Sequence, residues 1–498
     1  MLMEKIRNQY LSVSDRCQQI RRLEPKFNFF GLPLSQSKST EASPVNVMAE
    51  QRNQAGMRAT EILLSIKPHK TTFLDTPFPP IPPTSQLVHV CGHGHVCGHG
   101  PLNGPFKVDD NEDYLINGAR VKLNPYSWSK VSNMIYIDAP AGTGFSYADN
   151  TDDYIVDDPE INADIYEFIL KWFLEYPEFL PNPFYVIGSS YGGMLVPVVS
   201  LLIDEGLEAG TKPRINFKGY SIGNAFTDIR IDNNAEIPYA HRMGLISDEQ
   251  YKALKKSCHG NYWNSSIPDC EKNMEDYMKT AGAINKYHVL CLPCHFVMGI
   301  TTTTNLNNKI TQRNSTYGEM VYETDCGGAV AEHAHGRRRL PERQHPPDSI
   351  YCCDYNHRPS MLFNSESGRR DMHAQPIEVS GIWERCTKRL THRVEERSLV
   401  EYHLNLTTKG YRAFIYNGDH DMVVSYLATM EWIKLLNYTE IEKWQPWFVG
   451  DQIAGYAIQY EHNLLYATFR GSGHTVPEYT PIEGLEAYRR WIDGSDSL

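Results

Sequence analysis

Residues 184–193 read FYVIGSSYGG, and this short stretch decides the fold class of the chain. Its first half, Phe184–Ile187, is an apolar run typical of a strand that is buried on both faces. The pentapeptide Gly188–Gly192 follows directly, and residues 194–205 read as a helix. A serine between two glycines at a strand-to-helix turn holds its hydroxyl above the edge of a parallel sheet. We expect the flanking glycines to be required because the backbone there leaves no room for side chains.

The alternation of strands and helices continues on both sides of this turn. Apolar runs predict further strands at residues 134–137, 217–223, 411–416 and 464–469, and the remaining periodic segments predict helices at residues 161–179, 427–436 and 481–492. Strands that alternate with helices form a mostly parallel sheet with helices on both faces. The sequence therefore predicts an α/β fold.

The later strands end in residues that can activate a serine. A serine hydroxyl needs a general base, and the base needs an acid that orients it. One strand is followed by Asp419 and Asp421, and the last strand by a glycine-rich loop that carries His474. The carboxyl ends of parallel strands share one edge of a sheet, so we expect these side chains to lie near Ser190. The choice between the two aspartates stays open, and the Tyr191 amide is placed to face an oxyanion.

Five long stretches are distinctive. They are NPYSWSKVSNMIYIDAPAGTGFSY (124–147), NPFYVIGSSYGGMLVP (182–197), INFKGYSIGNAFTD (215–228), VEYHLNLTTKGYRAFIYNGDHDMVV (400–424) and WQPWFVGDQIAGYAIQYEHNLLYATFRGSGHTVPEY (444–479). They resemble the serine carboxypeptidases, and more closely the plant-type serine carboxypeptidase-like branch, which includes acyltransferases. The resemblance covers most of residues 101–498 and implies an α/β-hydrolase fold with an inserted cap region. It implies Ser190 as nucleophile, Asp421 as acid, His474 as base and Tyr191 as the donor of one oxyanion-hole amide.

The chain departs from that family at two places that touch the substrate. The family usually has an acidic residue directly before the nucleophile, which helps to bind the terminal carboxylate of a peptide, and here this residue is Ser189. The family's Asn-Gly-Gly-Pro-Gly-Cys loop, which gives the second oxyanion amide, is missing. We expect Ser189, Gly192 and Tyr147 to border the substrate, which is a peptide or a small-molecule ester.

A doubled motif stands where that loop is expected. Residues 89–100 read HVCGHGHVCGHG. Its glycines can offer backbone amides, and by the same resemblance Cys91 or Cys97 takes the place of the loop cysteine, with Cys352 or Cys353 as partner. Zinc sites usually gather their ligands from separated turns, whereas these cysteines lie six residues apart in a glycine run. We therefore predict neither a functional metal site nor a cofactor.

Two classes of function follow from these residues. In the first, Ser190 forms an acyl-enzyme and water releases the acyl group, so the chain is a serine carboxypeptidase-like hydrolase that removes C-terminal residues. An alcohol in place of water would make it an acyltransferase that uses an activated ester donor. In the second class, the loss of half the oxyanion hole costs about 2.7–4 kcal/mol in the barrier. That loss would leave a catalytically impaired relative with a binding role.

Composition excludes several other functions. The formal net charge of −12 provides no basic field for nucleic acid. No run of about 18 apolar residues exists, so the sequence predicts no membrane span. The N-terminus lacks the apolar segment of a signal peptide, although the family resemblance implies a secreted or vacuolar location. The oligomeric state does not follow from the sequence.

The chain divides into four predicted regions. They are an atypical, poorly structured segment (1–88), the first part of the hydrolase core (89–228), an inserted cap region (229–350) and the second part of the core (351–498). The family's disulfides imply pairs of Cys258 with Cys270, and of Cys294 (or Cys291) with Cys326. Glycosylation sequons stand at Asn264, Asn314, Asn405 and Asn437.

Overall fold

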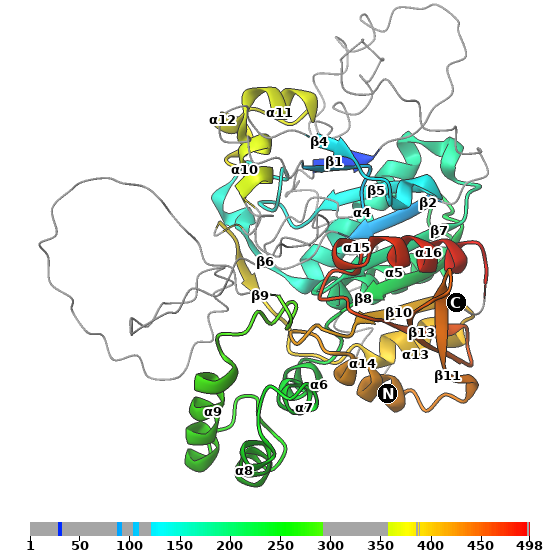
Figure 1. Ribbon diagram of the computed structural model, residues 1–498. Helices are drawn as coiled ribbons and strands as arrows, with labels where there is room; N and C mark the ends of the chain where they lie inside the picture. The colour runs from blue at the N-terminus through cyan, green and yellow to red at the C-terminus, as the bar shows by residue number, and fades with distance from the viewer. Residues whose placement is uncertain are drawn as a thin grey trace, which may run out of the picture.

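A nine-stranded sheet runs through the centre of the molecule (Figure 1). The computed structural model describes residues 28–31, 87–91, 103–108, 121–291, 357–384, 387, 389–495 and 498. The strand order is β1 (Asn28–Gly31), β5 (Asn133–Asp138), β2 (Leu87–Cys91), β7 (Phe184–Ser189), β8 (Phe217–Gly223), β10 (Arg412–Gly418), β13 (Leu464–Phe469), β12 (Gln452–Tyr460) and β11 (Glu440–Val449). The six strands from β5 to β13 are parallel, and the three outer strands are antiparallel to their neighbours. The predicted α/β fold with a mostly parallel sheet is confirmed.

Helices cover both faces of this sheet because alternate residues of its strands point to opposite sides. Val186 and Ile415 belong to the apolar core on one face, and their chain neighbours Tyr185 and Phe414 to the core on the other. The first core packs against α4 (Asp158–Glu175), α5 (Gly192–Glu208), α13 (Val400–Thr408) and α14 (Tyr426–Leu435). The second packs against α16 (Pro481–Ile492) and the short helix η4 (Trp128–Lys130).

Helix α4 differs at both ends from its predicted range of 161–179. It begins at Asp158, where the Asp157 side chain accepts a hydrogen bond from the Glu160 amide and completes a capping box. It ends at Glu175, because Pro177 lacks an amide hydrogen and the chain passes into the short helix η6 (Pro177–Phe179).

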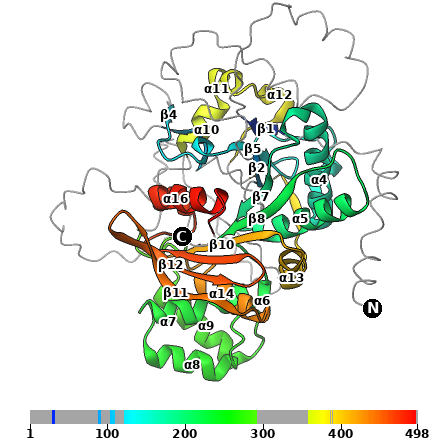
Figure 2. The ribbon, with the colours of Figure 1, turned by 90° about the vertical axis from the view of Figure 1, so that its right-hand side faces the viewer.

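Four helices of the predicted cap region lie at one end of the molecule, away from α11 (Glu366–Asp371) and α12 (Ile377–Ser380) (Figure 2). They are α6 (Ile229–Asn234), α7 (Glu236–Arg242), α8 (Asp248–Cys258) and α9 (Pro268–Ala281). Helices α7, α8 and α9 form an apolar core of their own, which includes Leu254 and Tyr277 and reaches Met422 of the main domain, whereas Ile231 of α6 packs against the first core. The residues of the predicted cap from 292 to 350 lie outside the described part of the chain.

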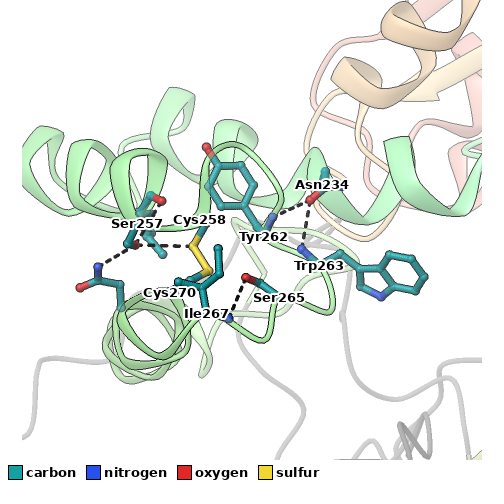
Figure 3. The surroundings of a disulfide bond; sticks show 10 residues. Asn234, Ser257, Cys258, Tyr262, Trp263, Ser265, Ile267 and Cys270 are labelled. Atoms are coloured by element: carbon teal, nitrogen blue, oxygen red, sulfur yellow. Dashed lines mark hydrogen bonds between the residues drawn. A yellow bond between two sulfur atoms is a disulfide. The ribbon is translucent and has the colours of Figure 1, made fainter.

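A disulfide joins the end of α8 to the start of α9 (Figure 3). The predicted pair of Cys258 and Cys270 is confirmed, with an S–S distance of 1.98 Å. The loop between the two cysteines is tied to α6, because the amides of Tyr262 and Trp263 donate to Asn234 Oδ1 at 2.7 and 3.0 Å.

The remaining described elements are small. They are β3 (Phe106–Val108) paired with β4 (Val121–Leu123), η5 (Thr151–Tyr154), β6 (Ile155–Asp157) paired with β9 (Thr391–Arg393), α10 (His357–Asn364) and α15 (Val476–Tyr479). The region 1–88, which was predicted to be poorly structured, contributes β1 and the first two residues of β2 to the sheet. The predicted boundary at residue 88 therefore falls inside β2. No helix among the described residues is long and apolar enough to cross a membrane.

Candidate active site

Ser190 stands on a sharp turn between β7 and α5. Its φ angle is 56°, which is rare for a residue with a side chain. Backbone hydrogen bonds compensate for this strain. The Ser190 amide donates to the carbonyl oxygens of Gly223 and Asn224 at 3.0 and 3.1 Å, and its carbonyl accepts from the Phe226 amide at 3.0 Å. The loop after β8 therefore holds the serine turn in place.

Close packing explains some of the glycines in this turn. A Cβ atom on Gly188 would lie 2.7 Å from Val196 Cγ2, so the predicted crowding holds there. At Gly192 the prediction of crowding is not borne out, since a Cβ would meet no heavy atom of the described residues within 4 Å. The tightest position is Gly193, where a Cβ would lie 2.0 Å from the Phe226 carbonyl oxygen.

His474 and Asp421 form a buried pair at the same edge of the sheet. His474 Nδ1 and Asp421 Oδ2 are 2.7 Å apart. Asp421 also accepts hydrogen bonds from Asn224 Nδ2 at 2.8 Å and from the amides of Val423 and Val424 at 2.9 and 3.3 Å. A carboxylate only accepts hydrogen bonds, so Nδ1 of the imidazole carries the proton and Nε2 is left as the basic nitrogen.

The structure brings Asp421, rather than Asp419, to His474. Asp419 Oδ1 instead accepts the Gly471 amide at 2.8 Å, which ties the loop after β10 to the loop after β13. Burial raises the pKa of the Asp419 carboxyl above its ordinary value. Two carboxyl groups that are two positions apart in the chain thus have different partners.

A segment of the predicted cap region, Lys286–Val289, bridges the loops that follow β10 and β13. The Tyr287 carbonyl oxygen accepts the His474 amide at 2.7 Å, and the Tyr287 ring lies edge-on to the imidazole at a centroid distance of 5.2 Å. The Lys286 carbonyl oxygen accepts the Met422 amide at 2.9 Å. Sequence reasoning missed this segment, because backbone carbonyls carry no sequence signal.

Three of the other predicted site residues are close neighbours of Ser190 in the chain, and the fourth, Tyr147, comes from another segment. Tyr191 is buried and precedes the first residue of α5, Gly192, while Ser189 is half-buried at the end of β7. Tyr147 is buried beyond the turn that follows β5. The amino end of α5 therefore lies directly after the serine, where its amides favour negative charge.

Strand β2 leads the chain to this edge of the sheet. It lies between β5 and β7, and Val90 is the register partner of Ile187. The doubled motif begins inside β2 and leaves it after Cys91, beside the serine turn. Residues 92–102, with Cys97, and both Cys352 and Cys353 lie outside the described residues. Within the described ranges, no three His, Cys, Asp or Glu residues are grouped so that they could hold a metal ion.

The predicted modification sites differ in their surroundings. Asn264 and Asn437 are exposed in loops, and Asn405 is half-buried in α13. Asn314, Cys294 and Cys326 lie outside the described residues. Cys291, the predicted alternative to Cys294, takes part in a disulfide.

The chain is similar in sequence to known proteins. Residues 96–494 match the model of a protein family that is described as "Serine carboxypeptidase". The chain is 40% identical over 399 residues to serine carboxypeptidase 1 of Hordeum vulgare, with 79% of each chain covered. It is 38% identical over 378 residues to serine carboxypeptidase-like 20 of Arabidopsis thaliana, with 75% of this chain and 76% of that protein covered.

A solved structure also has a similar fold. It is that of Kex1(delta)p, a prohormone-processing carboxypeptidase from Saccharomyces cerevisiae, which is 16% identical. The match has a TM-score of 0.58 and covers 95% of this chain and 91% of that chain.

Proposed function

Because the chain belongs to the serine carboxypeptidase family, we propose that it hydrolyses peptides from the C-terminus through an acyl-enzyme on Ser190. The observation that carries this proposal is the 2.7 Å hydrogen bond between His474 Nδ1 and Asp421 Oδ2. It stands at the same edge of the sheet as the strained serine turn.

The proposed reaction has two halves. Ser190 Oγ attacks the carbonyl carbon of the last peptide bond, and His474 Nε2 accepts the hydroxyl proton. The imidazolium then gives this proton to the leaving amine, which departs as the C-terminal amino acid. Water attacks the acyl-enzyme with the same base and releases the shortened peptide. Asp421 holds the imidazole through both halves and stabilises its positive charge.

The oxyanion of each tetrahedral intermediate needs two donors. The Tyr191 amide is the first in this proposal. The sequence predicts the second donor among the glycines of the doubled motif, and residues 92–102 of that region lie outside the described residues. Two amides fixed in advance are what such an intermediate requires, and the removal of one costs about 2.7–4 kcal/mol.

The substrate is a peptide, and Ser189, Gly192 and Tyr147 border it. Ser189 carries no charge, so at this position the terminal carboxylate can receive only a hydrogen bond from a neutral hydroxyl. The names of the similar proteins, which are serine carboxypeptidases or serine carboxypeptidase-like proteins, favour hydrolysis over acyl transfer.

We also propose a secreted or vacuolar location. A disulfide is typical of proteins that fold in an oxidising compartment, and the chain contains one between Cys258 and Cys270. The exposed sequons at Asn264 and Asn437 are open to glycosylation there.

A fluorophosphonate probe tests the proposed nucleophile. We expect the purified protein to be labelled, Ser190→Ala to lose the label, and Ser200→Ala to keep it. Ser200 is a matched control because it is a buried serine of α5, the helix that follows Ser190, and its hydroxyl has no hydrogen-bond partner in the described part. Absence of labelling in folded protein would contradict the hydrolase and favour the impaired relative.

A pair of peptides tests the specificity. The two peptides share one sequence, and one has a free C-terminus while the other ends in an amide. A carboxypeptidase releases the last residue of the first peptide only. Equal cleavage of both would refute the terminal specificity, and faster transfer to an added alcohol than to water would favour the acyltransferase.

A further inference from the structure

The side chain of Tyr191 is held by a buried carboxylate outside the catalytic triad. The Tyr191 hydroxyl donates to both oxygens of Asp158, at 2.8 Å to Oδ1 and 2.9 Å to Oδ2. Both residues are buried, and Asp158 has no exposed surface. The residue whose amide faces the oxyanion is therefore anchored through its own side chain.

Asp158 has further donors that fix its position. His392 Nε2 lies 2.9 Å from Oδ1, and the Glu395 amide donates to Oδ2 at 3.1 Å. Burial alone would raise the pKa of Asp158, but the hydrogen bonds from His392, the Glu395 amide and Tyr191 hold it below its ordinary value. The group is thus a carboxylate that only accepts, so the tyrosine hydroxyl and the imidazole both donate to it.

The cluster joins three segments that are distant in the sequence. Asp158 is the first residue of α4, where a negative charge interacts favourably with the helix dipole. His392 lies in β9, which pairs with β6 through Val156. The imidazole also lies edge-on to the Tyr191 ring, at a centroid distance of 5.3 Å. Such a bridge between regular elements is a rigid support for the turn after Ser190.

We propose that the cluster of Asp158, Tyr191 and His392 positions the oxyanion-hole amide of Tyr191. The Ser190 carbonyl, on the same peptide unit as that amide, accepts hydrogen bonds from the amides of Gly193 and Phe226. The cluster holds the same peptide unit through the side chain of Tyr191, whose hydroxyl donates to Asp158. These residues act through the amide and are positioning residues, and the inference rests on the proposed acyl-enzyme at Ser190.

The test removes the anchor and leaves the amide in place. Tyr191→Phe deletes the hydroxyl, and Asp158→Asn deletes the charge with little change in shape. The matched control is Tyr411→Phe, because the Tyr411 hydroxyl donates to Asp204 Oδ1 at 2.7 Å near the other end of α5. The readouts are the rate constant of fluorophosphonate labelling, and kcat and KM for p-nitrophenyl acetate. Melting temperatures report on folding.

We expect kcat and the labelling rate to fall by about 10- to 100-fold in Tyr191→Phe and Asp158→Asn, because small displacements of catalytic groups have effects of that size. KM stays close to the parent value, since the amide acts in the transition state. The double variant falls no further than the worse single variant, because the two residues act as one unit. Tyr411→Phe keeps the parent rate.

The outcomes distinguish failure of the proposed nucleophile, Ser190, from failure of the positioning role of the cluster. A parent protein that is not labelled refutes the nucleophile itself, and with it the basis of the inference. A labelled parent with parent-like rates in both single variants overturns the positioning role alone. If either variant melts well below Tyr411→Phe, His392→Gln replaces it, because the glutamine amide keeps a donor for Asp158. If His392→Gln and the remaining stable single variant both have the parent's rates, the positioning role of the cluster is overturned as well.

Discussion

Asp232 is a buried carboxyl group whose charge should set part of the pH dependence of stability. It lies in α6 and is only 2% exposed. Its Oδ2 accepts the amides of Thr227 and Asp228 at 2.8 and 3.0 Å, and its Oδ1 has no hydrogen-bond partner in the described part of the chain. Burial raises the pKa of Asp232 to about 7, although the two amide hydrogen bonds lower it.

The sign of the effect follows from the two pKa values. The pKa in the folded state, about 7, lies above the ordinary value of 3.8, so the folded protein keeps a proton that the unfolded chain has lost. The stability from this group is present below the ordinary pKa and is lost as the pH rises through about 7. Each pH unit in this window costs about 1.4 kcal/mol, which gives about 3 kcal/mol between about pH 4.5 and 6.5.

Asp232→Asn isolates this contribution, because an amide carries no charge at any of these pH values. For a chain of this size, about 1 kcal/mol corresponds to about 1 °C in Tm. The melting temperature of the variant, measured against that of the parent by scanning fluorimetry, should therefore rise by about 3 °C across the window. Asp138, whose pKa burial also raises to about 7, titrates in both proteins and cancels in the difference.

The control is Asp248→Asn. Asp248 is exposed, and hydrogen bonding to His241 lowers the pKa of its carboxyl. Any pH effect there therefore has the opposite sign to that at Asp232. Parallel Tm curves for the parent and Asp232→Asn would refute the reasoning, because they would mean that Asp232 is ionised in the folded protein throughout the window.

Three further predictions concern the site and the cap. Asp421→Asn should lower kcat by about 10⁴-fold in a folded protein, because the imidazole takes the wrong tautomer, and activity near the parent value would exclude Asp421 as the acid. Loss of the disulfide in a Cys258→Ser, Cys270→Ser variant should cost about 3 kcal/mol in denaturant unfolding, and an unchanged midpoint would contradict this. Gly193→Ala should slow fluorophosphonate labelling, because its Cβ meets the Phe226 carbonyl oxygen, whereas Gly484→Ala in α16 should not; equal rates in the two variants would disprove the clash.

Five of the parallel strands, β5, β7, β8, β10 and β13, could be predicted because each contains a mainly apolar run, whereas β2, which lies between β5 and β7, was not predicted. β13 and α16 have the predicted bounds, 464–469 and 481–492. The edge strand β11 was not predicted, because most of its residues are exposed and it contains Pro446, so neither an apolar run nor an alternation stands out. Helix α13 was missed as well, because His403 and Thr407 are polar residues in its buried face.

The residues of the proposed triad could be predicted from their order and from the strands that precede them. The residues that hold them together could not. Lys286–Val289 contacts the catalytic loops through backbone atoms, which any sequence supplies. The Asp158 cluster depends on His392 and Tyr191, which lie more than 30 positions from it. One available signal was overlooked, since Asn224 follows a third parallel strand, β8, at the same edge of the sheet.

Asn224 explains why the nucleophile and the acid keep a fixed relation although they come from different strands. Its backbone carbonyl accepts the Ser190 amide at 3.1 Å, and its side-chain amide donates to Asp421 Oδ2 at 2.8 Å. Its Oδ1 accepts the Gly418 amide at 3.0 Å, so the asparagine also holds the end of β10. Its φ angle of 43° is one that asparagine tolerates better than most residues. A single buried residue, through its backbone and its side chain, thus connects the ends of β7, β8 and β10, and a shift of any of these three ends would move both proposed catalytic groups together.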